Sequence, residues 1–153
     1  MSKCWLIISL ITLFLFSANS YASAGHSNNE IDIGKPGDAA KAARTIKLAL
    51  VDNMFLPDEI TVKEGETIRF VIKNGGNRKH GIIIGLMADL KKIAKMRREF
   101  PDKDFSAEHL IQLEPGEQKE LIWQFADAGT VNFACPLPGH FKKMRGIITV
   151  EKK

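Results

Sequence analysis

A short loop near the C-terminus carries three side chains that bind soft metals. Cys135, His140 and Met144 offer a thiolate, an imidazole and a thioether at the spacing Cys-x4-His-x3-Met. Copper held by two imidazoles and one thiolate in a trigonal plane, with a long and weak axial contact to Met, is the geometry used for electron transfer. The loop supplies three of these four ligands, so the pattern predicts a second imidazole from elsewhere in the chain. His80 is the candidate for it.

Each of these residues also has a purely structural interpretation. A lone Cys is commonly an inert buried residue, and a Met beside a strand commonly fills a core. That interpretation requires potential ligands of the right types to occur in the right order by accident. We therefore favour the metal site.

The same residues carry a resemblance to a known family. With Pro138-Gly139 before the His, the loop Cys135–Met144 resembles that of the cupredoxins (type 1 copper proteins), small periplasmic proteins like azurin and plastocyanin, and its spacing looks like the azurin branch. The resemblance extends over roughly residues 45–151. It implies one type 1 copper ion, held by His80, Cys135, His140 and Met144.

The resemblance also implies details of the surroundings of these ligands. Backbone N–H groups of Gly81 and Leu137 would donate hydrogen bonds to the Cys135 sulfur, a kind of contact that tunes the reduction potential of a metal. The sequence departs from the azurin pattern at two positions. Gly81 stands where azurins usually carry Asn, and Lys79 stands where they carry Gly.

The N-terminus has the features of a secretory signal. Lys3 precedes an apolar run from Trp5 to Phe16, and the small residues Ala22-Ser23-Ala24 form an A-x-A cleavage site. The apolar run is shorter than the roughly 20 residues of a membrane-spanning helix. We therefore expect residues 1–24 to be removed on export to the periplasm, which leaves no membrane span. An uncleaved membrane anchor is the alternative.

Cleavage would change what the cysteines can do. The chain has two Cys, and loss of Cys4 with the signal leaves Cys135 alone, without a partner for an internal disulfide. A single thiol in an oxidising compartment is exposed to oxidation unless something protects it. A bound metal is one such protection.

The rest of the chain predicts a single β-domain. Residues 25–44 are polar and rich in Gly, Ala and Lys, so we expect a flexible lead-in, with a short helical piece at Ala39–Ala43, to a domain over residues 45–153. From Thr45 onward, short alternating runs separated by turn signals are typical of strands. They cover residues 45–50, 60–62, 67–73, 80–84, 109–113, 120–125, 130–135 and 147–150. This pattern predicts an all-β fold, a Greek-key β-sandwich or barrel.

One segment interrupts the strands. Residues Met87–Phe100 place apolar side chains at helical spacing and basic side chains on the opposite side, and Pro101 ends the pattern. We expect one amphipathic helix inserted on the surface of the β-domain. Its basic face is either a binding face or a solvated helix surface.

These observations favour a one-electron carrier that cycles between Cu(I) and Cu(II), and not an enzyme. Nitrite reductases and multicopper oxidases add a second, His-rich copper centre, and only His26 and His109 remain of the four His in this chain. The alternative is a copper-tolerance protein that holds copper or keeps it in one oxidation state. Such a protein is expected to carry extra Met or His clusters, of which the sequence has few.

Charge indicates the kind of partner. The chain has 22 basic and 18 acidic side chains, too balanced for nucleic-acid or general membrane binding. Locally, His140 is followed by Lys142, Lys143 and Arg145, and complementary charge speeds the encounter of two proteins. We expect a monomer whose partner is a redox protein that docks an acidic face at this end.

Overall fold

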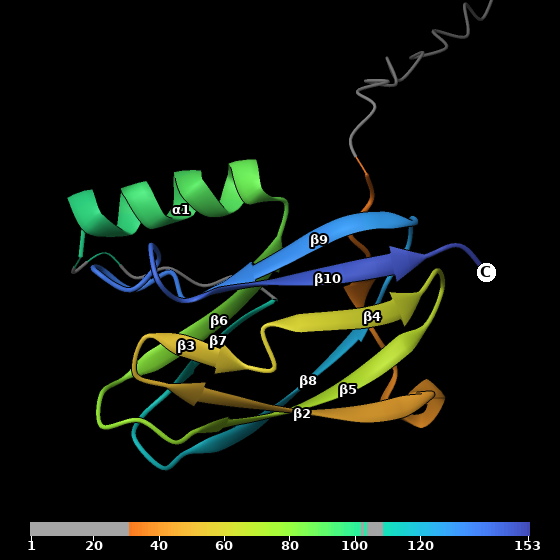
Figure 1. Ribbon diagram of the computed structural model, residues 1–153, viewed down its shortest axis with the longest axis horizontal. Helices are drawn as coiled ribbons and strands as arrows, with labels where there is room; N and C mark the ends of the chain where they lie inside the picture. The colour runs from red at the N-terminus through yellow and green to blue at the C-terminus, as the bar shows by residue number, and fades with distance from the viewer. Residues whose placement is uncertain (1–30, 102, 104–108) are drawn as a thin grey trace, which may run out of the picture.

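The computed structural model describes residues 31–101, 103 and 109–153. The expected signal peptide over residues 1–24 and the first part of the lead-in lie outside these residues. Within them the chain forms two five-stranded sheets and one α-helix (Figure 1). The expected all-β sandwich with one inserted helix is confirmed.

The first sheet has the strand order β1-β8-β5-β2-β3, and the second has the order β4-β10-β9-β6-β7. Strand β2 pairs in parallel with β5, and β10 in parallel with β4, while the remaining pairs are antiparallel. The strands are β1 (Lys35–Pro36), β2 (Arg44–Val51), β3 (Met54–Leu56), β4 (Glu59–Lys63), β5 (Thr67–Asn74), β6 (His80–Gly85), β7 (Leu110–Leu113), β8 (Gln118–Gln124), β9 (Gly129–Ala134) and β10 (Arg145–Glu151).

The core lies between the two sheets. In β4 and β10 every second residue is buried, because successive side chains of a strand point to opposite faces. Phe55 and Phe133 meet edge to face in this core, with ring centroids 5.0 Å apart. Cys135 and Met144 belong to the same buried cluster. The predicted metal loop therefore closes one end of the core.

The helix α1 (Met87–Glu99) covers the outer face of the second sheet, so the surface helix expected over Met87–Phe100 is confirmed. Leu90 packs there against Ile83 and Ala134, and Phe141 from the metal loop packs beside them. Because Ile82 and Ile84 face the core on the other side, β6 is buried along its whole length. The contact with Phe141 places the helix next to the metal loop. In the described parts of the chain, no helix has the length and apolar character needed to cross a membrane.

Two strands were missed by the sequence analysis. Strand β1 pairs with β8, and residues Ala39–Lys41 form a 3-10 turn capped by the Asp38 side chain, so part of the expected lead-in packs on the first sheet. Strand β3 pairs with β2. Both are too short, at two and three residues, to display an alternating pattern.

Gly146 provides a test of the packing next to the metal loop. It lies opposite Phe133 in the β9–β10 pair, and a Cβ there would come 2.1 Å from the Phe133 ring and 2.6 Å from the Asp58 carbonyl oxygen. We expect Gly146→Ala to lower the free energy of unfolding by about 1–3 kcal/mol, measured by urea denaturation. In Gly75→Ala the new methyl group has no neighbour closer than 3.8 Å, so this control should change stability little. Equal effects of the two substitutions would contradict this packing.

Candidate metal centre

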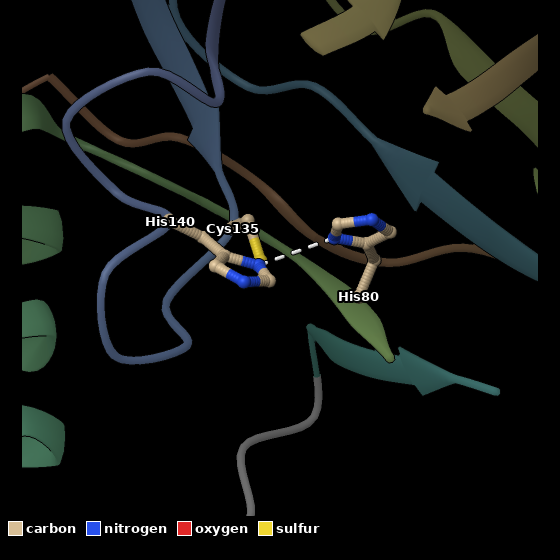
Figure 2. Close-up of side chains that lie close together, drawn as sticks. All are labelled: His80, Cys135 and His140. Carbon is tan, nitrogen blue, oxygen red and sulfur yellow. Dashed lines mark hydrogen bonds between the residues drawn. The ribbon is translucent and has the colours of Figure 1, made fainter. Parts of the chain in front are cut away.

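Side chains from two distant segments of the sequence converge at one end of the sandwich (Figure 2). His80 begins β6, Cys135 directly follows β9, and His140 lies in the loop between β9 and β10. Strands β6 and β9 are antiparallel neighbours, so the start of one lies beside the end of the other. The ligand atoms of the three residues all lie within 4.8 Å of one another. The structure thus brings together three of the four residues that the sequence singled out.

The separations between these atoms fit a shared metal ion. Bonds of about 2.0 Å to nitrogen and about 2.3 Å to sulfur, arranged in a trigonal plane, would place two nitrogens about 3.5 Å apart and nitrogen about 3.7 Å from sulfur. The observed distances are 3.2 Å between the Nδ1 atoms of His80 and His140 and 3.6 Å from His140 Nδ1 to Cys135 Sγ. One thiolate with two imidazoles is a soft donor set that suits copper.

The Cys135 thiol is fully buried. Burial raises the pKa of this thiol above its ordinary value, while hydrogen bonds from the backbone N–H groups of Leu137 and Gly81 act in the opposite direction. The Gly81 donor lies 3.4 Å from the sulfur. Both backbone donors implied by the family resemblance are therefore present. The raised pKa favours the neutral thiol at neutral pH, and a metal must displace its proton to bind.

The two imidazoles differ in their surroundings. His80 is completely buried, and its Nε2 lies 2.7 Å from Asp52 Oδ1. His140 is partly exposed, and desolvation by burial, followed by its proximity to His80, lowers the pKa of its ring. The lowered pKa favours the neutral imidazole, which is the form that binds metals.

Met144 completes the loop. Its backbone oxygen accepts a hydrogen bond of 3.0 Å from the Cys135 N–H, and its own N–H donates to the His140 oxygen over 3.0 Å. The side chain is fully buried in the same cluster as Cys135. These backbone bonds fix where the loop returns to the core. The axial role of the thioether stays a prediction.

Sequence reasoning missed Asp52. It lies in the turn between β2 and β3, and no local pattern marks it as part of a site. Because β2 pairs in parallel with β5, with Leu50 opposite Asn74, the end of β2 reaches the loop that precedes His80. Only this pairing brings the carboxylate to the imidazole.

His109 does not join this group. His109 lies against the Trp123 ring, with centroids 5.5 Å apart, and His26 is outside the described residues. Over residues 31–101, 103 and 109–153, the triad of His80, Cys135 and His140 is the one group of three or more His, Cys, Asp or Glu side chains able to hold a metal ion.

A buried cysteine and two histidines at the end of a two-sheet sandwich define the class of type 1 copper proteins. A family model described as a cupredoxin-like domain matches residues 6–150. The chain therefore belongs to the cupredoxin-like family. The expectation of copper as the cofactor is confirmed by this family and by the triad.

Two relatives and one solved structure illustrate the similarity. The chain is 39% identical to the copper-resistant cuproprotein CopI of Rubrivivax gelatinosus, over 84% of this chain and 85% of the relative. It is 34% identical to the protein of the same name from Pseudomonas aeruginosa, over 94% of each. Reduced auracyanin from Roseiflexus castenholzii shares the fold, with a TM-score of 0.60 and 24% identity over 71% of this chain and 98% of that one.

The raised pKa of Cys135 predicts a pH dependence of stability in the metal-free protein. A free thiol titrates near pH 8.5, so the unfolded chain loses this proton at about that pH, whereas the folded chain keeps it to higher pH. The contribution of the thiol to stability is thus fully present below about pH 8.5 and is lost as the pH rises toward the folded pKa.

Urea denaturation of the reduced, metal-free protein between pH 6 and pH 10 measures this effect against Cys135→Ser, which lacks the titrating group. We expect the difference in unfolding free energy between the two proteins to be constant up to about pH 8 and to shift against the wild type above it. A difference that stays constant to pH 10 would show that burial does not perturb this thiol.

Proposed function

We propose that this protein is an exported copper-resistance protein that binds one copper ion through His80, Cys135 and His140, with Met144 as the axial ligand. The observation that carries this proposal is the convergence of the three ligand atoms within 4.8 Å in the folded chain. Relatives named copper-resistant cuproproteins support the role in resistance. The signal predicted over residues 1–24 supports export from the cytoplasm.

The chain holds its ligands in place by contacts that do not involve the metal. His80 and Cys135 are both fully buried, so water has little access to that side of the centre. Backbone hydrogen bonds fix the loop between Cys135 and Met144. Copper bound there would exchange one electron between its +2 and +1 states. A preorganised ligand set needs little movement for either state.

Replacement of the sulfur ligand tests this function. Cys135→Ser has nearly the same shape as the wild type but lacks the thiolate, and we expect loss of the intense visible absorption band on copper loading. In a deletion strain, the wild-type gene should restore growth on copper, and the Cys135→Ser gene should not. Circular dichroism of the metal-free variant controls for folding. A folded variant that keeps the absorption band would refute the assignment of Cys135 as a ligand. A folded variant that fully restores growth on copper would refute the role of this site in resistance.

A second candidate function is electron transfer to a protein partner, which the surface beside His140 favours. A groove of about 270 Å³ lies between α1 and the metal loop. Leu137, Pro138 and Phe141 give it an apolar side next to the partly exposed His140. An apolar surface at an exposed ligand allows another protein to approach closely.

Basic side chains line the rest of this groove. Lys91, Lys95 and Arg98 come from α1 and Lys142 from the metal loop, and the groove has no carboxylate among the lining residues that the structure describes. The sequence analysis expected Lys142, Lys143 and Arg145 to form the positive surface. Basic residues of the helix α1 enlarge this positive surface. The Arg145 guanidinium instead lies over the Phe141 ring, 5.7 Å from its centroid. We propose that a redox partner with an acidic face docks in this groove.

Charge reversal in the groove tests this candidate with a small anionic oxidant. We expect Lys91→Glu with Lys142→Glu to slow oxidation of the copper(I)-loaded protein by ferricyanide several-fold at low ionic strength, because attraction becomes repulsion. The difference should shrink above about 0.1 M salt, where the screening length is about 10 Å. Lys47→Glu with Lys73→Glu, on the first sheet, makes the same change in net charge elsewhere. Stopped-flow rates that fall equally in both double variants would argue against the groove.

A further inference from the structure

We propose that Asp52 is a positioning residue of the metal centre. Its carboxylate holds the His80 ring so that Nδ1 faces the other ligands, and it places a negative charge against this ligand that favours the oxidised metal. The proposal rests on the ligand assignment made above and assigns a role to a residue outside the four ligands.

The contact itself is short and protected. His80 Nε2 and Asp52 Oδ1 are 2.7 Å apart, and the His80 side chain is 0% exposed while that of Asp52 is 32% exposed. A carboxylate only accepts hydrogen bonds when ionised, so the proton of the neutral ring lies on Nε2. The lone pair then lies on Nδ1, the atom that faces His140 Nδ1 at 3.2 Å. Carboxylates that fix metal-binding histidines in this way commonly control both ring orientation and basicity.

The carboxylate is held by the loop that leads into His80. Its second oxygen, Oδ2, accepts a hydrogen bond of 3.3 Å from the Asn77 backbone N–H. The Arg78 guanidinium Nε lies 3.9 Å from Oδ1. Asp52 therefore contacts the imidazole of His80 and also two residues of the loop that precedes it, Asn77 and Arg78. This arrangement ties the β2–β3 turn to the metal ligand.

The loop between β5 and β6 is shaped to permit this contact. Fully buried Asn74 donates to the backbone oxygens of Arg78 and Leu113 at 2.8 and 3.1 Å, and its own side-chain oxygen accepts from the Gly76 N–H at 2.9 Å. A Cβ at Gly76 would lie 2.5 Å from Asp52 Oδ1 and 3.0 Å from His80 Nε2. The glycine leaves the space in which the carboxylate and the imidazole meet.

The two effects of Asp52 can be separated because one needs only an acceptor and the other needs a charge. Any oxygen acceptor at this position keeps the proton on His80 Nε2. Only an anion adds Coulombic stabilisation to copper(II), which carries one more positive charge than copper(I). Asp52 should therefore lower the reduction potential of the centre. The Arg78 guanidinium, whose Nε lies 3.9 Å from Asp52 Oδ1, opposes this effect.

Three variants test the proposal. Asp52→Asn keeps the shape and the acceptor but removes the charge, and Asp52→Ala removes both. Glu114→Gln is the control, because it removes an exposed carboxylate that pairs with Lys79, the neighbour of His80, at 2.9 Å. By protein-film voltammetry we expect the reduction potential to rise in both Asp52 variants relative to the control. In Asp52→Ala we also expect copper affinity to fall about 10–100-fold.

A readout without copper separates this proposal from the ligand assignment. In ¹⁵N NMR spectra of the metal-free protein, His80 should carry its proton on Nε2 in the wild type and in Asp52→Asn, and should populate the Nδ1-protonated form in Asp52→Ala. If Cys135→Ser retains the copper band, the ligand assignment fails while the NMR result still reports on Asp52. The Asn variant carries the test if the Ala variant does not fold. The proposal would be overturned if both Asp52 variants had the same reduction potential as Glu114→Gln and if His80 in both kept the tautomer found in that control.

Discussion

The hydrogen bond from the Gly81 N–H to the Cys135 sulfur, 3.4 Å long, joins the two strands that carry buried metal ligands. It forms because β6 and β9 are antiparallel neighbours. It also requires a close approach of the backbone, since a Cβ at Gly81 would lie 3.1 Å from the Ile111 oxygen and 3.5 Å from Pro136 Cδ. The other ligands depend on this contact, because His80 precedes Gly81 and the loop to His140 starts at Cys135.

The surroundings of the centre are asymmetric in both water access and charge. On the His80 side the imidazole is fully buried and faces a carboxylate. On the His140 side the imidazole is partly exposed, and the groove beside it is lined by basic side chains from α1 and the metal loop. One side can therefore stabilise the oxidised metal, while the other offers a surface to negatively charged molecules. This asymmetry is compatible with both proposed roles, the binding of copper and the exchange of electrons with a partner.

The sequence predicted the features that are local in the chain. Three of the predicted ligands stand within the ten residues from Cys135 to Met144, so their types and spacing can be recognised directly. The longer strands and the helix each show the periodicity of their own kind of structure. His80, from a distant segment, was also predicted as a ligand, but other features that depend on how distant segments pack were missed. Asp52 reaches His80 only through the parallel β2–β5 pair, which a single sequence does not reveal. The basic residues of α1 were visible, but their place beside the metal loop depends on how the helix packs with Phe141 against the sheet.

A crystal structure of the copper-loaded protein tests most directly the central claim that the folded chain presents a preformed copper site. The account predicts one copper ion bound to His80 Nδ1, Cys135 Sγ and His140 Nδ1, with Asp52 still against His80 Nε2. It also predicts that the loop from Cys135 to Met144 differs from the metal-free conformation by less than about 1 Å, the range of preorganised binding sites. Copper bound through His80 Nε2, or a loop rebuilt around the ion, would contradict the claim.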